Sequence, residues 1–207
     1  MPAAPAVRVW PGGQTSRGSS PTVGILALQG DFEAHAKILC SLGATARDVR
    51  VPDDLTDLDA LVIPGGESTV MTLGIEREGL GSPLRELARA GTPVLGTCAG
   101  LIMLDRDHLG LLDVRAQRNA FGRQLRSFEA RLDFRGLTGG PVHAVFIRAP
   151  WIAEWGPEVE VLAQVQEHPV AVRQGRLLAV AFHPELTGET RLHALLLESV
   201  AAARVSR

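Results

Sequence analysis

The sequence predicts an α/β fold, in which helices cover both faces of a mainly parallel central sheet. In the first half of the chain, short apolar runs alternate with segments of helical periodicity. The apolar runs end abruptly in turn residues, such as Gln29-Gly30 and Pro64-Gly65-Gly66. Uninterrupted apolar runs are typical of parallel strands buried on both faces, and the intervening helices indicate right-handed crossovers.

The composition is that of an ordinary globular protein. Of the 207 residues, 45% are hydrophobic, and 21 Lys and Arg against 23 Asp and Glu give a formal net charge of −2. This balance excludes a fibre and a disordered chain, and it argues against a nucleic-acid partner, which requires a basic face. No apolar run reaches the roughly 18 residues of a membrane span, and no signal-peptide core is present. We therefore expect a cytoplasmic protein that binds neither membrane nor nucleic acid.

The first half of the chain supplies the parallel sheet. Residues 1–21 lack periodicity, so we expect a mobile N-terminal extension, followed by a single domain over 22–207. Gly43 is a helix stop, and Pro83 stands near the first turn of a later helix. The expected elements are a strand at 22–28, a helix at 31–42, strands at 44–50 and 58–63, a helix at 83–90 and a strand at 93–97.

In the second half, turn residues rather than helices separate the apolar segments. This pattern indicates antiparallel strands or an extension of the sheet. The expected strands are 128–134, 142–147, 159–164, 170–173 and 177–182, and a helix rich in leucine and alanine follows at 191–203.

The most informative motif is Gly96-Thr97-Cys98-Ala99-Gly100, between a buried strand and the apolar residues 101–104 of a helix. Small residues beside the cysteine permit the sharp turn of a nucleophile elbow. A thiol at a helix N-terminus is favoured as the thiolate, and the Ala99 N–H would face an oxyanion. A buried cysteine in a tight turn is the alternative. Cys40 lies within a helix, and we expect it only to pack.

His183 is the best placed of the six histidines to serve Cys98. It follows an apolar strand, and Glu185 stands two residues on, on the same side of an extended segment. Pro184 keeps the preceding residue extended, so Glu185 can orient the imidazole as the third member of a triad. A surface turn without function is the alternative. We expect the other histidines to be structural, because none has the spacing of a zinc site.

A second motif, Pro64-Gly65-Gly66-Glu67-Ser68, ends a strand of the parallel half and should share the sheet edge with Cys98. Its glycines allow close approach of a ligand to the backbone, although the motif alone also fits a plain turn. Together with the elbow, it makes Gly66 a candidate oxyanion donor beside Ala99.

Beyond these motifs, the chain closely resembles the glutaminase subunits of pyridoxal 5'-phosphate synthase, within the class I, triad-type glutamine amidotransferases. The elbow and His183-Pro184-Glu185 are shared by many class I glutaminases, whereas blocks 118–124 and 146–150 are more specific to this subunit. The similarity extends from Val23 to Val200. The matching blocks are Leu28-Gln29-Gly30, 64–69, 96–101, Arg118-Asn119-Ala120-Phe121-Gly122-Arg123-Gln124, 127–130, Phe146-Ile147-Arg148-Ala149-Pro150 and 182–187.

The resemblance implies a flavodoxin-like three-layer sandwich of the class I glutaminase type, which hydrolyses L-glutamine to L-glutamate and ammonia. It assigns Cys98 as the nucleophile and His183 and Glu185 as the remaining triad members, with no cofactor and no metal. Ammonia would pass to a synthase subunit that makes pyridoxal 5'-phosphate, in a dodecameric core carrying up to one glutaminase per synthase chain. The positions that match the family's glutamine contacts are Gly66, Glu67, Ser68, Arg118, Ile147 and Arg148.

The chain departs from the family pattern at two places. Residues 105–107 form a shorter connection to His108 than the family usually has, and residues 1–21 have no counterpart in it.

Three other functions stay open at this point. A protease or chaperone with a cysteine elbow commonly has histidine directly after the cysteine, where this chain has Ala99. A non-catalytic regulatory subunit would not need an intact triad. An amidotransferase that serves a different synthase would share the triad with the proposed family.

Overall fold

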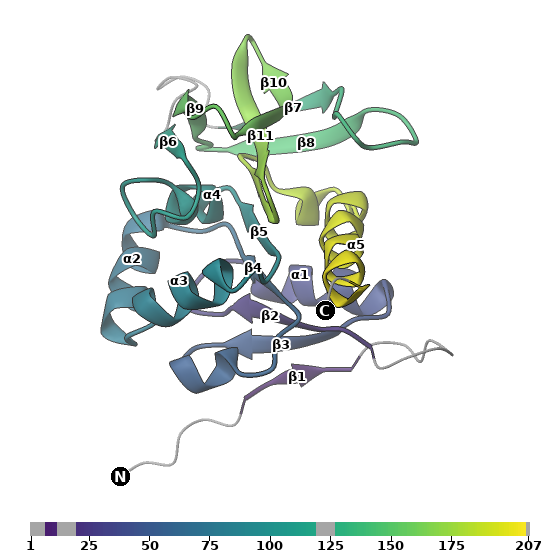
Figure 1. Ribbon diagram of the computed structural model, residues 1–207. Helices are drawn as coiled ribbons and strands as arrows, with labels where there is room; N and C mark the ends of the chain where they lie inside the picture. Colours follow the sequence, from purple (N-terminus) through teal and green to yellow (C-terminus); the bar gives the residue numbers. More distant parts are fainter. Residues whose placement is uncertain (1–6, 12–19, 119–126, 206–207) are drawn as a thin grey trace.

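The computed structural model describes residues 7–11, 20–118 and 127–205 (Figure 1). Within these residues, the centre of the protein is a mostly parallel sheet of eight strands. The five central strands run parallel, and antiparallel strands extend the sheet at both edges. In spatial order the strands are β1 (Val9–Trp10), β3 (Thr45–Val49), β2 (Thr22–Leu26), β4 (Ala60–Ile63), β5 (Val94–Thr97), β12 (Leu177–Val180), β11 (His168–Gln174) and β10 (Glu160–Val165).

Helices cover both faces of this sheet, which confirms the predicted α/β fold (Figure 1). Helices α1 and α5 lie on one face, and α2, α3 and α4 lie on the other. No helix of the described part of the chain combines the length and the apolar character that a membrane span requires. The helices are α1 (Phe32–Ser41), α2 (Ser68–Arg77), α3 (Gly81–Arg89), α4 (Ala99–Leu104) and α5 (Arg191–Val205), and short 3-10 helices span Pro52–Leu55 and Pro184–Leu186.

The central strands are buried on both faces, as their uninterrupted apolar runs predict. Every residue of β4 and β5 is buried, and these strands belong to one apolar core that also includes Phe146 and Phe182. Removal of apolar surface from water stabilises the fold by roughly 25 cal/mol per Å². The carboxyl ends of β2, β4, β5 and β12 therefore form a rigid edge on which loops can present functional groups.

The predicted antiparallel character of the second half is confirmed. β10, β11 and β12 are antiparallel neighbours in the large sheet. Two further pairs form small separate sheets above it, β7 (Ser127–Leu132) with β8 (Val142–Ile147), and β6 (Val114–Gln117) with β9 (Trp151–Trp155) (Figure 1). The sequence pattern did not predict β6 or β9, because β6 is short and its alternation covers only four residues.

Helix α2 is a second element that the sequence pattern does not predict. Its interior contains Gly74 and several β-branched residues, which are poor helix formers and obscure the helical spacing. The helix starts because the Glu67 carboxylate accepts the N–H groups of Thr69 and Val70, at 3.1 Å and 2.8 Å. Packing against α4 then stabilises it, a contact that local propensity does not reveal.

Part of the segment that we expected to be a mobile extension forms an edge strand. β1 pairs antiparallel with β3, with Trp10 opposite Ala46. The Trp10 indole donates a hydrogen bond of 3.2 Å to the buried Asp48, and the Arg8 guanidinium lies 3.7 Å from the centroid of the Trp10 ring. The open edge of β3 and the Asp48 carboxylate supply partners that composition alone does not indicate. The rest of the expected extension, residues 1–6 and 12–19, lies outside the described residues.

Candidate active site

The cysteine lies on a sharp turn between β5 and α4, as the elbow motif predicts. Cys98 has a φ of 49°, a backbone conformation that costs energy for any residue except glycine. A Cβ on Gly100 would lie 2.0 Å from the Ile63 carbonyl oxygen, and one on Gly96 would lie 2.8 Å from the Gly100 carbonyl oxygen. Both positions therefore require glycine, because the turn presses the start of α4 against β4 and β5.

His183 and Glu185 lie on the turn that follows β12. The backbone N–H of His183 donates to the Val145 carbonyl oxygen of β8 at 2.9 Å, which fixes the path of the backbone before the turn. The His183 Nδ1 lies 2.7 Å from Oε1 of Glu185, and the Glu185 side chain is only 1% exposed. The carboxylate thus holds the imidazole through its Nδ1 atom, as the His-Pro-Glu spacing predicts.

The backbone of Gly65 brings the thiol and the imidazole together. A Cβ on Gly65 would lie 2.5 Å from Cε1 of His183 and 3.2 Å from Cβ of Cys98. Both side chains therefore pack against the same glycine at the end of β4. Cys98 is 6% exposed, and its Sγ lies 3.9 Å from the Ile147 carbonyl oxygen.

The electrostatics at His183 favour its charged form. Burial lowers the pKa of His183, but its hydrogen bonds with Cys98 and Glu185 and the charges of both groups outweigh burial and raise the pKa to about 10. His183 is therefore an imidazolium at neutral pH, placed between a sulfur atom and a buried carboxylate. An imidazolium beside a thiol stabilises the thiolate, which is the nucleophilic form of cysteine.

Two backbone N–H groups at this edge lack an acceptor in the described part of the chain. Among the described residues, neither the Ala99 N–H nor the Gly66 N–H donates a hydrogen bond to another protein group. Ala99 is the first residue of α4, directly after the thiol, and Gly66 follows the glycine that contacts His183. These two groups are the predicted oxyanion donors.

The predicted substrate-binding residues divide into two groups. The Glu67 carboxylate caps α2 and accepts from Nη2 of Arg118 at 3.2 Å, and Ser68 is buried in the first turn of α2. Hydrogen bonds from the Val70 and Thr69 N–H groups, with the charge of Arg118, lower the pKa of Glu67. In the second group, Ile147 ends β8, and its carbonyl oxygen lies near Sγ of Cys98.

Arg148 follows Ile147 with a φ of 46°, and its side chain is exposed. Within the described residues its guanidinium has no hydrogen-bond or ion-pair partner. Residues 119–124, the remainder of the predicted block that begins at Arg118, lie outside the described residues.

Sequence reasoning missed a positioning side chain at this edge. Gln29 follows β2, and its Oε1 accepts the Glu67 N–H at 2.6 Å. A Cβ on Gly66 would lie 2.2 Å from the same oxygen, so Gln29 sets the path of the glycine turn. The available signal was the position of Gln29 directly after a buried strand that ends at the edge shared with Cys98.

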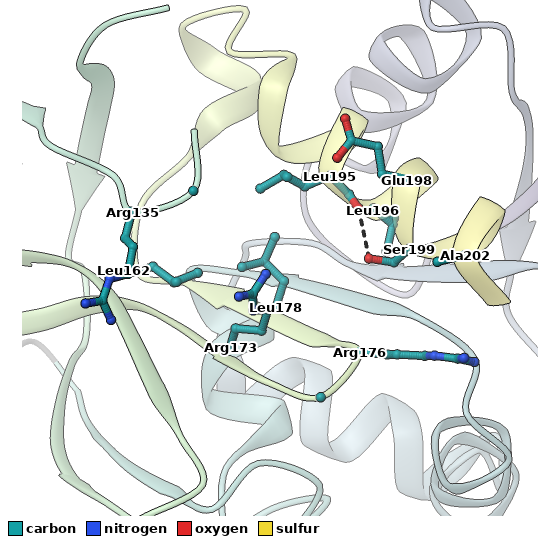
Figure 2. Close-up of a pocket in the computed structure, with 12 residues that line it drawn as sticks. Arg135, Leu162, Arg173, Arg176, Leu178, Leu195, Leu196, Glu198, Ser199 and Ala202 are labelled. Carbon is teal, nitrogen blue, oxygen red and sulfur yellow. Dashed lines mark hydrogen bonds between the residues drawn. The ribbon is translucent and has the colours of Figure 1, made fainter. Parts of the chain in front are cut away.

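A cavity of about 250 Å³ lies away from these residues, between the β11–β12 turn and α5 (Figure 2). None of the predicted site residues lines it. All three of its guanidinium groups already have protein partners. Arg173 and Arg135 pair with Glu160, at 2.6 Å and 3.7 Å, and Arg176 donates to the Gly91 carbonyl oxygen at 2.9 Å. In the part of the chain that the structure describes, no three His, Cys, Asp or Glu side chains are grouped to hold a metal ion.

A thiol on a strand-to-helix elbow, beside an imidazole held by a buried carboxylate, defines the class of α/β proteins with a cysteine nucleophile elbow. Within that class, residues 25–202 match the SNO glutamine amidotransferase family, and the chain belongs to this family. The match confirms the predicted resemblance.

Curated relatives and a solved structure agree with this assignment. The chain is 52% identical over 194 residues to the pyridoxal 5'-phosphate synthase subunit PdxT of Mycolicibacterium vanbaalenii, covering 88% of this chain and 99% of the relative. It is 53% identical over 192 residues to the protein of the same name from Mycobacteroides abscessus, with coverage of 88% and 99%. A crystal structure described as a glutamine amidotransferase is 45% identical, with a TM-score of 0.81 over 86% of this chain and 98% of that one.

Proposed function

We propose that this chain hydrolyses L-glutamine to L-glutamate and ammonia through Cys98, His183 and Glu185. The observation that carries the proposal is the meeting of the three side chains at one sheet edge, with His183 charged at neutral pH. Membership of a glutamine amidotransferase family supports glutamine as the substrate and an amide as the bond that is cleaved.

The proposed reaction has two stages. The Cys98 thiolate attacks the side-chain amide carbon of glutamine, and the carbonyl oxygen takes up the electron pair as an oxyanion. The free N–H groups of Ala99 and Gly66 are suited to stabilise it. His183 then donates its proton to the amide nitrogen, so ammonia leaves and a thioester remains. A water molecule that gives a proton to His183 attacks the thioester, which releases glutamate and restores the thiolate.

We propose that the charged residues around the thiol bind the two ends of the amino acid. Arg148 has no protein partner among the described residues, so its guanidinium is available for the α-carboxylate of glutamine. The low pKa of Glu67 keeps that carboxylate charged, which suits an α-ammonium group. Arg118, Ser68 and Ile147 complete the proposed substrate contacts.

The names of the relatives support a partner that consumes the ammonia, because both are called subunits of pyridoxal 5'-phosphate synthase. We propose that this chain forms a heteromeric complex with a synthase subunit and channels ammonia to it. The family resemblance suggests a dodecameric synthase core with up to one glutaminase per synthase chain, in the cytoplasm.

The test is glutamate release from L-glutamine by the purified chain, with and without the synthase subunit. We expect the rate to rise with the synthase, to vanish in Cys98→Ala and to persist in Cys40→Ala, the matched control. Cys40 lies in α1, and its thiol donates to the Trp10 carbonyl oxygen at 3.4 Å. Absence of hydrolysis under both conditions would refute the proposed function.

A further inference from the structure

A cluster of buried polar side chains lies directly behind the carboxylate that holds His183. His35 comes from α1, Thr97 from the end of β5, Glu185 from the turn after β12 and His193 from α5. None of the four side chains is more than 1% exposed. Polar groups with no access to water depend on one another for partners, and in the described residues His193 Nδ1 is buried without a hydrogen bond of regular geometry.

Three contacts join the cluster. The His35 Nδ1 lies 2.8 Å from Nε2 of His193, and the His35 Nε2 lies 3.3 Å from Oγ1 of Thr97. The same Nε2 lies 3.5 Å from Oε2 of Glu185, the carboxylate oxygen that does not face His183. Among the described residues, this Oε2 has no hydrogen bond of regular geometry, although it is fully buried.

Both histidines of the cluster are neutral at pH 7. Burial lowers the pKa of His35 to about 3, with the charge of Glu185 offsetting part of the effect. Burial also lowers the pKa of His193 to about 4, against a hydrogen bond with the Glu189 backbone that raises it. Each neutral ring carries one N–H, and one of these protons lies between His35 and His193. When His193 donates it, the proton of His35 sits on Nε2 and faces Glu185. The other tautomer of His35 would turn a lone pair toward the carboxylate, which is electrostatically unfavourable.

We propose that His35, with its proton on Nε2, is a positioning residue for Glu185, an inference that rests on the proposed function. The His35 N–H attracts Oε2 and so stops the carboxylate from rotating, which leaves Oε1 aligned with Nδ1 of His183. At 3.5 Å the contact is long for a hydrogen bond, but the buried setting strengthens the attraction between an N–H dipole and a carboxylate. The same Nε2–H also lies near the hydroxyl oxygen of Thr97, the residue before Cys98, which can accept from it.

Three variants of His35 separate positioning from packing. His35→Gln places an amide N–H where Nε2 lies, so it retains the donor to Glu185. His35→Asn reaches only the position of Nδ1, so it retains the contact with His193 and loses the donor. His35→Leu fills the space without any polar group. Gln and Asn carry the same amide group and differ by one methylene, which makes them a matched pair.

The primary measurement is the rate of Cys98 alkylation by iodoacetamide as a function of pH, followed by peptide mass spectrometry. We expect a step in the profile where His183 loses its proton, because the charge beside the thiol changes there. We expect the step to move to lower pH by about one unit, a tenfold change in the proton equilibrium, in the Asn and Leu variants. The Gln variant should retain the wild-type step. With synthase present, kcat for glutamine should fall about tenfold in Asn and Leu at unchanged KM.

The outcomes are distinguishable from those that test the proposed function. A wild-type step in all three variants, or equal shifts in the Gln and Asn variants, would overturn the positioning role. If His35→Leu does not fold, the comparison of Gln with Asn still decides the question. The alkylation profile does not depend on glutamine, so it tests His35 even if wild-type protein proves unable to hydrolyse that substrate.

Discussion

Replacement of Gly100 by alanine tests the physical basis of the elbow. In the structure, an added Cβ would lie 2.0 Å from the Ile63 carbonyl oxygen and 2.9 Å from its carbonyl carbon, whereas ordinary van der Waals contact begins at 3.4 Å. Both obstructing atoms belong to the backbone of β4, a fully buried strand. The start of α4 would therefore have to move away from the sheet by roughly 1 Å or more.

The expected cost follows from two opposing effects. Alanine in place of glycine gains up to about 1 kcal/mol of helix propensity in a helix interior. Over-packing of a rigid interior typically costs about 1–3 kcal/mol, and here no flexible side chain can yield. We expect Gly100→Ala to lower the free energy of unfolding by about 2 kcal/mol. A displacement of about 1 Å at Cys98, the proposed nucleophile, should also reduce glutamine hydrolysis by on the order of a hundredfold.

Gly81 provides the matched control, because it opens α3 as Gly100 lies in the first turn of α4. A Cβ on Gly81 would lie 3.3 Å from Nη1 of Arg85, the flexible end of a long side chain. Gly81→Ala should therefore keep its stability within about 1 kcal/mol of the wild type. Urea unfolding followed by circular dichroism measures both variants. A Gly100→Ala protein as stable as Gly81→Ala would refute the steric explanation of the motif.

Three further predictions concern charge. Glu185→Gln retains the shape of the side chain but removes the charge that stabilises the imidazolium, so the pKa of His183 should fall by about 1–3 units in the thiol alkylation profile; an unchanged profile would contradict this. Arg148→Met should raise KM for glutamine at least about tenfold with little change in kcat, and a wild-type KM would mean that the carboxylate binds elsewhere. Burial lowers the pKa of His35 to about 3 and that of His193 to about 4. Below about pH 6.5, the unfolded chain therefore binds protons that the folded chain does not, and the free energy of unfolding falls as pH falls. Between pH 7 and pH 5, the free energy of unfolding of the wild type should fall by at least about 2 kcal/mol more than that of a variant with glutamine at both positions, as measured by urea unfolding. Equal losses in the two proteins would show that these rings are not buried as neutral bases.

The fold was predictable wherever one physical requirement dominated the local sequence. Burial of β4 and β5 on both faces requires unbroken apolar runs, and these runs are visible without a structure. Helix α2 was not predictable, because its start depends on the Glu67 cap and its stability on packing against α4. The edge strand β1 depends on an open edge and on Asp48, about 40 residues further along the chain.

The candidate site follows the same rule. The sequence could point to Cys98 as a candidate because its turn restricts the neighbouring residues to small ones, and to His183 because Glu185 is close in sequence. His35 and His193 are 158 residues apart and each lies on an apolar helix face, where a histidine is ordinarily structural. Their relation to Glu185 arises only when α1 and α5 pack on the same face of the sheet.

The neutrality of His35 is what allows Glu185 to act on His183 alone. A buried carboxylate is costly unless a cation compensates for it, and two cations would compete for its charge. If His35 were protonated, it would pair with Oε2, and the attraction that holds the proton on His183 would weaken. Burial prevents this by lowering the pKa of His35 to about 3, while contact with the thiol and the carboxylate raises that of His183 to about 10. In the proposed arrangement, the carboxylate thus has one charged partner, on the side of Cys98, and one neutral donor that fixes its orientation.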